Sequence, residues 1–258
     1  MAKFPVVYSE DFLTDYRTVD CENPDRAAAI RFAIQDTADF IDPEPCTEED
    51  LLRCHTRALI ETVERDQEIF SVAKKAAGGA IRAAEIALER PSFALIRPPG
   101  HHAGRNFNGG FCFFNNMAIA LNSLLSRGII KRALIVDIDL HYGNRTEDIV
   151  RGDDRISFWN IDTVGREEFF ADLGGALKTA HDYDIVGCSA GFDTYLHDWG
   201  GILFTEDYRK IAGMITSSSR RFFTVLEGGD YIEDLGKNVA SFLNGIREAY
   251  EDRYDGRD

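Results

Sequence analysis

The segment Arg132–Asn144, RALIVDIDLHYGN, decides the fold of this chain of 258 residues. Its apolar run Ala133–Val136 predicts a short strand buried on both faces, as in a parallel sheet. Asp137, Asp139 and His141 follow at spacing two, so their side chains point to one side. Burying two carboxylates and an imidazole is costly without partners, and a metal ion removes that cost. We therefore predict a metal-dependent site at the carboxyl end of this strand, where open α/β sheets bind ligands. The alternative is a solvated turn.

Short apolar strands alternate with helices along the rest of the chain. Further strands are predicted over residues 4–8, 93–97, 156–159, 184–189 and 222–226. Helices are predicted over residues 23–40, from 47, and over 71–89, 117–126, 146–150, 168–180, 205–216 and 232–250. This alternation indicates a parallel sheet covered by helices on both faces. We expect one domain over residues 1–258, with a charged, frayed end at 251–258.

Composition excludes several classes of function. Hydrophobic residues make up 44% of the chain, so a full core can form. The net charge of −15 argues against direct nucleic-acid binding, which needs a basic face. Acidity suits cationic substrates, although solubility explains it equally simply. No apolar run reaches the ~18 residues of a membrane span. Five cysteines without a CxxC pair favour a reducing, cytoplasmic location.

Polar, glycine-rich loops follow three further predicted strands, and they contain His101-His102, Asp193 and Glu227–Tyr231. Because the carboxyl ends of parallel strands share one edge of the sheet, we expect these loops to meet the loop of the first segment. Three oxygen or nitrogen ligands with an open position make a catalytic metal site. The predicted ligands are Asp139, His141 and Asp193.

The adjacent histidines His101 and His102 suit general acid and base chemistry near neutral pH. Asp137 and Asn144 are available to orient the two imidazoles, as groups behind a metal's ligands often do. A plain surface loop is the alternative for the histidine pair, and a helix cap or turn is the alternative for Asp193. His55 lacks neighbours at ligand spacing, so we expect a structural or surface role for it.

Five ordered segments resemble the signatures of the histone deacetylase family, which includes deacetylase-like amidohydrolases and acetylpolyamine amidohydrolases. They are RPPGHHA (97–103), GFCFFNN (110–116), VDIDLHYGN (136–144), SAGFD (189–193) and LEGG (226–229). NPDR (23–26) and TEEDLLRCH (47–55) are similar to the family's amino-terminal segments. The resemblance implies the arginase/deacetylase fold, a three-layer α/β/α domain with a mostly parallel sheet of about eight strands.

The resemblance also implies an activity and its residues. The activity is zinc-dependent hydrolysis that removes an acetyl or other short acyl group from an acylated amine, such as acetyl-lysine or an acetylpolyamine. Zinc is implied at Asp139, His141 and Asp193, and this hard ligand set also suits iron or cobalt. His101 and His102 form the implied dyad, with Asp137 paired to His101 and Asn144 to His102. Phe111 and Gly110 line the implied substrate tunnel, and Gly229 forms its inner rim. A structural potassium ion is implied at the main-chain oxygens of Asp139 and His141.

Two positions in the last loop and the segment Tyr142–Arg145 (YGNR, where the family commonly has HGNG) depart from the family pattern, and the last loop carries the chemical consequence. The family has EGGY, whose tyrosine donates a hydrogen bond to the developing oxyanion, but this chain has Asp230 there and Tyr231 one residue later. A carboxylate repels an oxyanion, whereas a donor stabilises it by about 3–4 kcal/mol. Three interpretations stay open. Tyr231 swings in, Asp230 is protonated by burial and donates, or the site is weak or only binds ligand.

Two other functions compete with this one. An arginase-type hydrolase uses two manganese ions and typically a DxHxD run, whereas this chain has DIDLH. A catalytically impaired protein that keeps the metal pocket and serves as an acyl-amine binder or scaffold is the second alternative. The sequence leaves the substrate, the native metal and the oligomeric state open.

Overall fold

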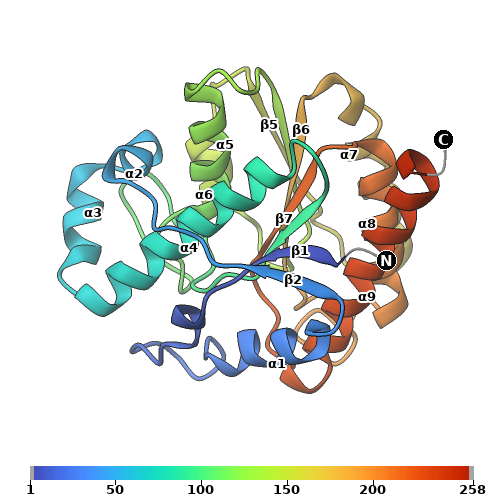
Figure 1. Ribbon diagram of the computed structural model, residues 1–258, viewed down its shortest axis with the longest axis horizontal. Coiled ribbons are helices and arrows are strands. Elements are labelled where there is room, and N and C mark those ends of the chain that lie inside the picture. Colours follow the sequence, from blue (N-terminus) through green and yellow to red (C-terminus); the bar gives the residue numbers. More distant parts are fainter. Residues whose placement is uncertain (1–2, 256–258) are drawn as a thin grey trace.

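The computed structural model describes residues 3–255, and a seven-stranded parallel sheet forms its centre (Figure 1). The strand order is β2-β1-β3-β7-β6-β4-β5. The strands are β1 (Phe4–Val7), β2 (Ala38–Ile41), β3 (Ser92–Ala94), β4 (Ala133–Asp137), β5 (Ile156–Asn160), β6 (Ile185–Ala190) and β7 (Phe222–Leu226). Every pairing among them is parallel. The fold class expected from the alternating pattern is confirmed.

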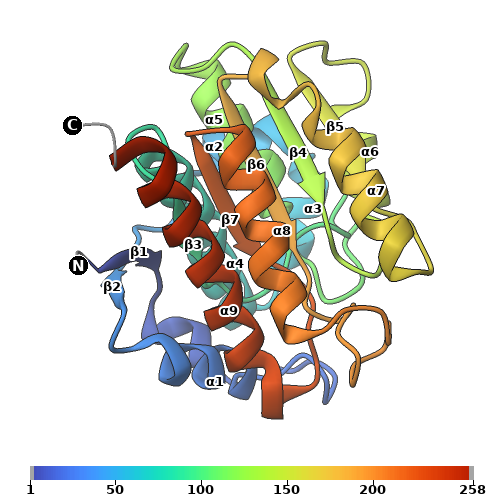
Figure 2. The same cartoon turned by 90° about the vertical axis from the view of Figure 1, so that its right-hand side faces the viewer.

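Helices cover both faces of this sheet. They are α1 (Asp25–Ile34), α2 (Glu48–Cys54), α3 (Arg57–Glu64), α4 (Gln67–Ile86), α5 (Asn116–Ser126), α6 (Asn144–Val150), α7 (Arg166–Leu177), α8 (Thr205–Ser218) and α9 (Ile232–Tyr250). Short helical turns are η1 (Glu10–Leu13), η2 (Ala180–Asp182) and η3 (Glu251–Asp255). Figure 1 shows α2, α3, α4 and α5 on one side of the sheet and α7, α8 and α9 on the other. Figure 2 shows α8 and α9 side by side over the sheet, and α1 packs on α9.

Burial explains the different strand sequences. The central strands β4, β6 and β7 are buried at every residue and are mostly apolar, because helices cover both of their faces. The edge strands β2 and β5 are partly exposed, and their sequences ADFI and ISFWN mix polar with apolar residues. No helix of the described residues is long and apolar enough to cross a membrane.

The amino-terminal region corrects one expectation. The helix predicted as far as Phe40 ends at Ile34, and residues 38–41 form β2 instead. In β2, Ala38 lies opposite Phe4 and Ile41 opposite Val7, so pairing with β1 fixes this segment as a strand. A four-residue apolar and polar mixture has too little periodicity to separate helix from strand. Within residues 3–255 the sheet has seven strands rather than about eight.

Two local features of the helices follow directly from the sequence. Thr47 and Asp50 form the capping box of α2, with both reciprocal hydrogen bonds present. Gly78 lies in α4 where a Cβ would collide with the backbone of residues 44–46, so this glycine allows close packing. The end that was expected to fray continues α9 as a π-helical turn over Glu251–Asp255, and 256–258 lie outside the described residues.

Strand order places the site. The polar loops follow β3, β4, β6 and β7, and these four strands are consecutive neighbours in the sheet, in the order β3-β7-β6-β4. All four are parallel, so their carboxyl ends lie at one edge. Loops separated by more than a hundred residues in sequence therefore meet in space.

Candidate active site

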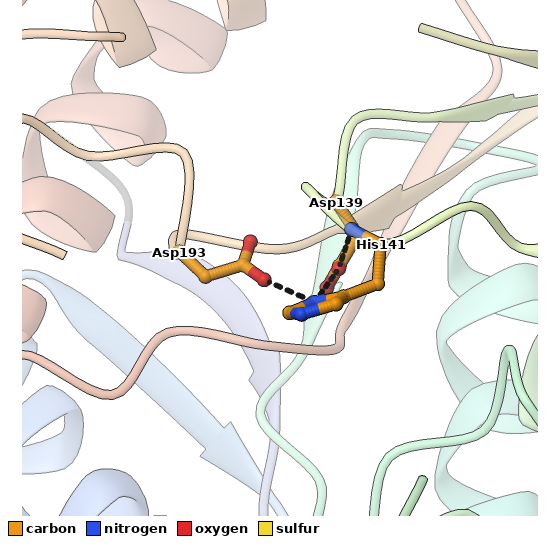
Figure 3. A group of neighbouring side chains, drawn as sticks. All are labelled: Asp139, His141 and Asp193. Atoms are coloured by element: carbon orange, nitrogen blue, oxygen red, sulfur yellow. Dashed lines mark hydrogen bonds and ion pairs between the residues drawn. The ribbon is translucent and has the colours of Figure 1, made fainter. Parts of the chain in front are cut away.

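Three side chains from two loops converge on one point (Figure 3). The ligand atoms of Asp139, His141 and Asp193 all lie within 4.8 Å of one another. Nδ1 of His141 is 2.8 Å from Oδ2 of Asp193 and 3.3 Å from Oδ1 of Asp139. The two carboxylates are buried, whereas the His141 side chain is 57% exposed. The arrangement is a three-ligand group with one open side, in the form expected for a catalytic metal.

The backbone holds these carboxylates in place. Asp139 accepts hydrogen bonds from its loop neighbour His141 N at 2.9 Å and from Gly228 N at 2.8 Å. Asp193 Oδ1 accepts from Leu140 N at 3.0 Å, which ties the β6 loop to the β4 loop. Oδ2 of Asp193 is buried, and its close polar neighbour among the described residues is Nδ1 of His141, at 2.8 Å. This oxygen faces the shared point and is available to a cation.

The charges of Asp139, His141 and Asp193 favour the binding of a cation. Burial raises the pKa of Asp193 to about 7, and the neighbouring Asp139 adds to the rise. Hydrogen bonds to Asp139 and Asp193 raise the pKa of His141 to about 10. A protonated imidazole thus sits between two carboxylates, in a place where a divalent cation satisfies both acids and leaves the imidazole neutral. Two carboxylates and one imidazole fit zinc, iron or cobalt as ligands.

The histidine pair lies beside this group. The rings of His101 and His102 are 4.0 Å apart between centroids. Nδ1 of His101 is 3.2 Å from Oδ2 of Asp137, and its Nε2 is 3.8 Å from Oδ1 of Asp139. Burial lowers the pKa of His101, but Asp139 and Asp137 outweigh burial and hold that pKa well above its usual value.

His102 has the opposite tendency. Burial, followed by the nearby His101, lowers the pKa of His102 to about 4, although a hydrogen bond with Asn144 opposes the shift. At neutral pH the pair therefore comprises a charged His101 and a neutral His102 able to accept a proton. Asp137 and Asn144 lie where the sequence analysis expects them, beside His101 and His102 respectively.

A cavity of about 130 Å³ opens onto these groups. Its lining includes His101, His102, Gly110, Phe111, Asp139, His141, Asp193, Gly228 and Asp230. Phe111 has a φ of 64° and follows Gly110 at 55°, so two successive residues adopt the left-handed conformation that L side chains rarely take. A Cβ at Gly110 would collide with the His102 ring, which explains the glycine. This backbone turns the Phe111 ring toward the cavity.

Asp230, and not Tyr231, lines the cavity. Oδ2 of Asp230 accepts a hydrogen bond from Trp199 Nε1 at 2.7 Å, and Oδ1 is 3.9 Å from Arg26 Nε. Burial raises the pKa of Asp230, while Arg26 opposes the shift. The Tyr231 ring packs instead against the rings of Tyr195 and His197, at centroid distances of 6.2 and 5.7 Å. The Tyr231 ring thus belongs to this aromatic group and not to the cavity lining.

Asp198 fixes this arrangement. Its Oδ2 accepts hydrogen bonds from the backbone N–H groups of both Asp230 and Tyr231, at 2.7 and 2.8 Å. Gly229, expected at the inner rim, has a φ of 125° and contributes its carbonyl to Arg26, whereas Gly228 lines the cavity.

Sequence reasoning missed a buried ionic group under the site. Arg97 Nε donates to Glu22 Oε1 at 2.6 Å, and Arg26 donates to the carbonyls of Gly229 and Glu227 at 2.7 and 2.6 Å. Glu22 and Arg26 both belong to the cavity lining. The NPDR segment contains Arg26 but not Glu22, and an arginine in the first turn of a helix does not by itself indicate burial.

A family model for the histone deacetylase domain matches residues 20–183, which is more than half of the chain. The chain belongs to the histone deacetylase family. Among its relatives, a probable deacetylase of Methanothermobacter thermautotrophicus is 30% identical over 89% of this chain and 87% of that protein. The acetylpolyamine amidohydrolase of Mycoplana ramosa is 33% identical over 61% of this chain and 57% of the relative.

The fold of this family member also has a solved counterpart. The crystal structure of the HDA15 HD domain superposes with a TM-score of 0.84 over 96% of this chain and 90% of that one. Because the two sequences are 22% identical, this likeness speaks for the fold alone. Its agreement with the family assignment confirms the arginase/deacetylase architecture.

Proposed function

We propose that this protein is a metal-dependent amidohydrolase that removes an acetyl or other short acyl group from an acylated amine. One observation carries the proposal. Asp139, His141 and Asp193 share one point, and the stacked pair His101-His102 lines the same cavity. Relatives named as deacetylases and acetylpolyamine amidohydrolases support the reaction class. A bound divalent cation supplies the chemistry of polarising the substrate carbonyl and lowering the pKa of water.

The chain's own residues perform the proton transfers. His102 is neutral and accepts a proton from the water that attacks the carbonyl carbon. His101, charged and held by Asp137, stabilises the negative charge that develops beside it. The protonated His102 then delivers its proton to the amine nitrogen as the C–N bond breaks, which yields a free amine and a carboxylate.

The ligand assignment is tested by metal content. We expect Asp193→Ala and His141→Ala to lose bound zinc, because each removes one of three ligands. Elemental analysis after dialysis measures this directly, with cobalt and iron loaded in parallel to identify the metal. Stoichiometric zinc retained by both variants would refute the assignment. Two metal ions per chain would support the arginase-type alternative, although the described residues hold one ligand cluster.

The dyad is tested separately. We expect His102→Ala to lose turnover while it keeps wild-type metal content, because the imidazole moves protons and does not bind the ion. Assays use acetyl-lysine peptides and monoacetylated polyamines, which also distinguish protein from small-molecule substrates. Near-wild-type turnover would contradict the assigned role.

A second candidate function is binding without turnover. Asp230 favours it, because a carboxylate lines the cavity where the family has a hydroxyl donor. If the protein only binds, wild type and His102→Ala bind an acylated amine with the same affinity, and neither releases a carboxylate. Potassium at the main-chain oxygens of Asp139 and His141, and a cytoplasmic location, stay predictions.

A further inference from the structure

Glu227 is a buried carboxyl group that the proposed proton transfers do not use. It follows β7 directly, and none of its surface is exposed. Its Oε2 accepts hydrogen bonds from two consecutive backbone N–H groups, Gly100 at 2.6 Å and His101 at 3.2 Å. These two residues belong to the loop that carries the histidine pair. Glu227 therefore holds the backbone N–H of the first histidine, while Thr146 donates to the carbonyl of the same residue through its N–H at 3.3 Å and its hydroxyl at 3.4 Å.

The main chain of Glu227 is itself fixed on both sides. Its N–H donates to Ala190 O at 2.9 Å, which continues the β6–β7 pairing past the end of the strands. Its carbonyl accepts from Arg26 Nη2 at 2.6 Å. Because β7 is the sheet neighbour of both β3 and β6, this carboxyl joins the histidine loop after β3 to the sheet edge that carries Asp193.

We propose that Glu227 is the positioning residue of the His101-His102 pair. By holding the histidine loop, Glu227 sets the distance between the two imidazoles and the carboxylates that follow β4 and β6. This inference rests on the proposed function and adds a residue that the sequence motifs do not assign. His101 touches Asp137 and Asp139 through its ring, but its backbone N–H is held by Glu227. A shift of the loop moves both imidazoles together, because they are adjacent in sequence.

Hydrogen-bond acceptance, rather than charge, does the positioning. Oε1 of Glu227 has no hydrogen-bond partner, and burial raises the pKa of this carboxyl to about 7. Glutamine has a side chain of the same length, keeps an acceptor oxygen at its end and carries no charge. Methionine has a similar length and volume but no oxygen. The pair Glu227→Gln and Glu227→Met thus separates positioning from simple filling of space.

The experiment measures kcat, KM and metal content for both variants with an acetylated-amine substrate. We expect Glu227→Met to lower kcat on the order of 10- to 100-fold, since small misplacements of catalytic groups cost that much. KM and metal content stay within twofold of wild type, because the three ligands and the cavity-lining residues outside the histidine loop are untouched. Glu227→Gln restores kcat to within a few-fold. Should the methionine variant fail to fold, Glu227→Asp, which withdraws the acceptor by one methylene, carries the same expectation.

Asp207→Leu is the matched control. Asp207 is also buried and accepts a backbone N–H, from Phe204 at 2.9 Å, but it caps α8 away from the cavity. Its loss lowers stability and leaves kcat and KM unchanged. The proposal is overturned if Glu227→Met retains wild-type kcat, or if Glu227→Gln is as slow as Glu227→Met.

Amide hydrogen exchange separates this proposal from the proposed function. The N–H groups of Gly100 and His101 exchange slowly when Glu227 accepts them, and we expect at least tenfold faster exchange in Glu227→Met. If wild type hydrolyses none of the acylated amines, the proposed function fails, and exchange still decides the role of Glu227. Equal exchange rates in wild type and Glu227→Met overturn it.

Discussion

Asp230 holds the position at which the sequence resemblance leads us to expect a tyrosine, and the surrounding contacts explain how a carboxylate is tolerated there. Trp199 donates to one oxygen, Arg26 lies 3.9 Å from the other, and Asp198 binds the backbone of the loop. These contacts hold the carboxylate at the cavity wall. They leave Tyr231 packed among other rings, so the sequence shift of one residue is not compensated by a shifted loop.

A first prediction follows for these two residues. We expect Asp230→Tyr to raise kcat for acetyl-lysine substrates by about tenfold or more, because a hydroxyl donor replaces a carboxylate near the developing oxyanion. Tyr231→Phe is the matched control and leaves kcat unchanged, because its ring lies in other packing. An Asp230→Tyr variant without gain, together with a Tyr231→Phe variant that loses activity, would assign the donor to Tyr231 instead.

At the scale of elements, α4 shows how a glycine determines packing. The backbone of residues 44–46 runs along this helix, and Cys46 N donates to Lys74 O at 3.0 Å. A Cβ at Gly78 would lie 2.7 Å from Cys46 N and 2.9 Å from Pro45 C, and these are backbone atoms that cannot turn aside. The glycine pair inside this Ala-rich helix is therefore a packing surface.

This contact predicts opposite effects of two alanine substitutions. We expect Gly78→Ala to lower the free energy of unfolding by about 1–3 kcal/mol, as overpacking does. Gly174→Ala in α7 is the control, since nothing lies within 4 Å of its added Cβ. That substitution raises stability by up to about 1 kcal/mol through helix propensity. Urea denaturation measures both, and equal effects would contradict the packing argument.

His55 links α2 to the histidine-bearing loop and has the structural role expected for it. Its Nδ1 is 2.8 Å from Gly104 O, and its Nε2 accepts from Asn115 N at 2.9 Å. Nε2 must stay unprotonated to accept this bond. Burial lowers the pKa of His55 to about 4.

A pH-dependent stability follows from this burial. The folded pKa lies below the unfolded value of about 6.5, so the unfolded chain binds the proton more tightly. Neutral His55 contributes about 3 kcal/mol to the free energy of unfolding above pH 6.5, and this contribution is lost as the pH falls toward 4. We expect urea denaturation between pH 7 and 4 to show a steeper loss for wild type than for His55→Gln. His181→Gln, at an exposed histidine, serves as the control, and parallel slopes for wild type and His55→Gln would contradict the prediction.

At the scale of the whole molecule, the net charge of −15 is the dominant property. An acidic surface attracts cationic ligands over distances of about 10 Å at 0.1 M salt and loses that attraction as salt rises. We expect kcat/KM for a monoacetylated polyamine to fall several-fold as salt rises through ~0.3 M, and kcat/KM for an uncharged acetylated amine to stay constant. Equal salt dependence for both substrates would assign the charge to solubility.

Many residues of the candidate site could be predicted from local sequence patterns. Asp139, His141, Asp193 and the pair His101-His102 follow short apolar strands, and parallel strands place their carboxyl ends at one edge whatever their order. The strand over residues 38–41 could not be predicted from the sequence. Its pairing with β1, rather than its own periodicity, makes it a strand. Glu22 and Arg26 were not readable either, because burial of a charged pair depends on what packs over it.

The sequence by itself determined which residue types follow each strand, and therefore the proposed ligands, the proposed dyad and the expected departure at Asp230. Those features are encoded within a few residues, where side-chain alternation and glycine turns act. The tertiary structure alone decided that β3, β7, β6 and β4 are neighbours, that Asp230 and not Tyr231 lines the cavity, and that Glu227 holds the histidine loop. These features depend on contacts between segments that lie from about thirty to more than a hundred residues apart in sequence, and such contacts form only when the sheet assembles.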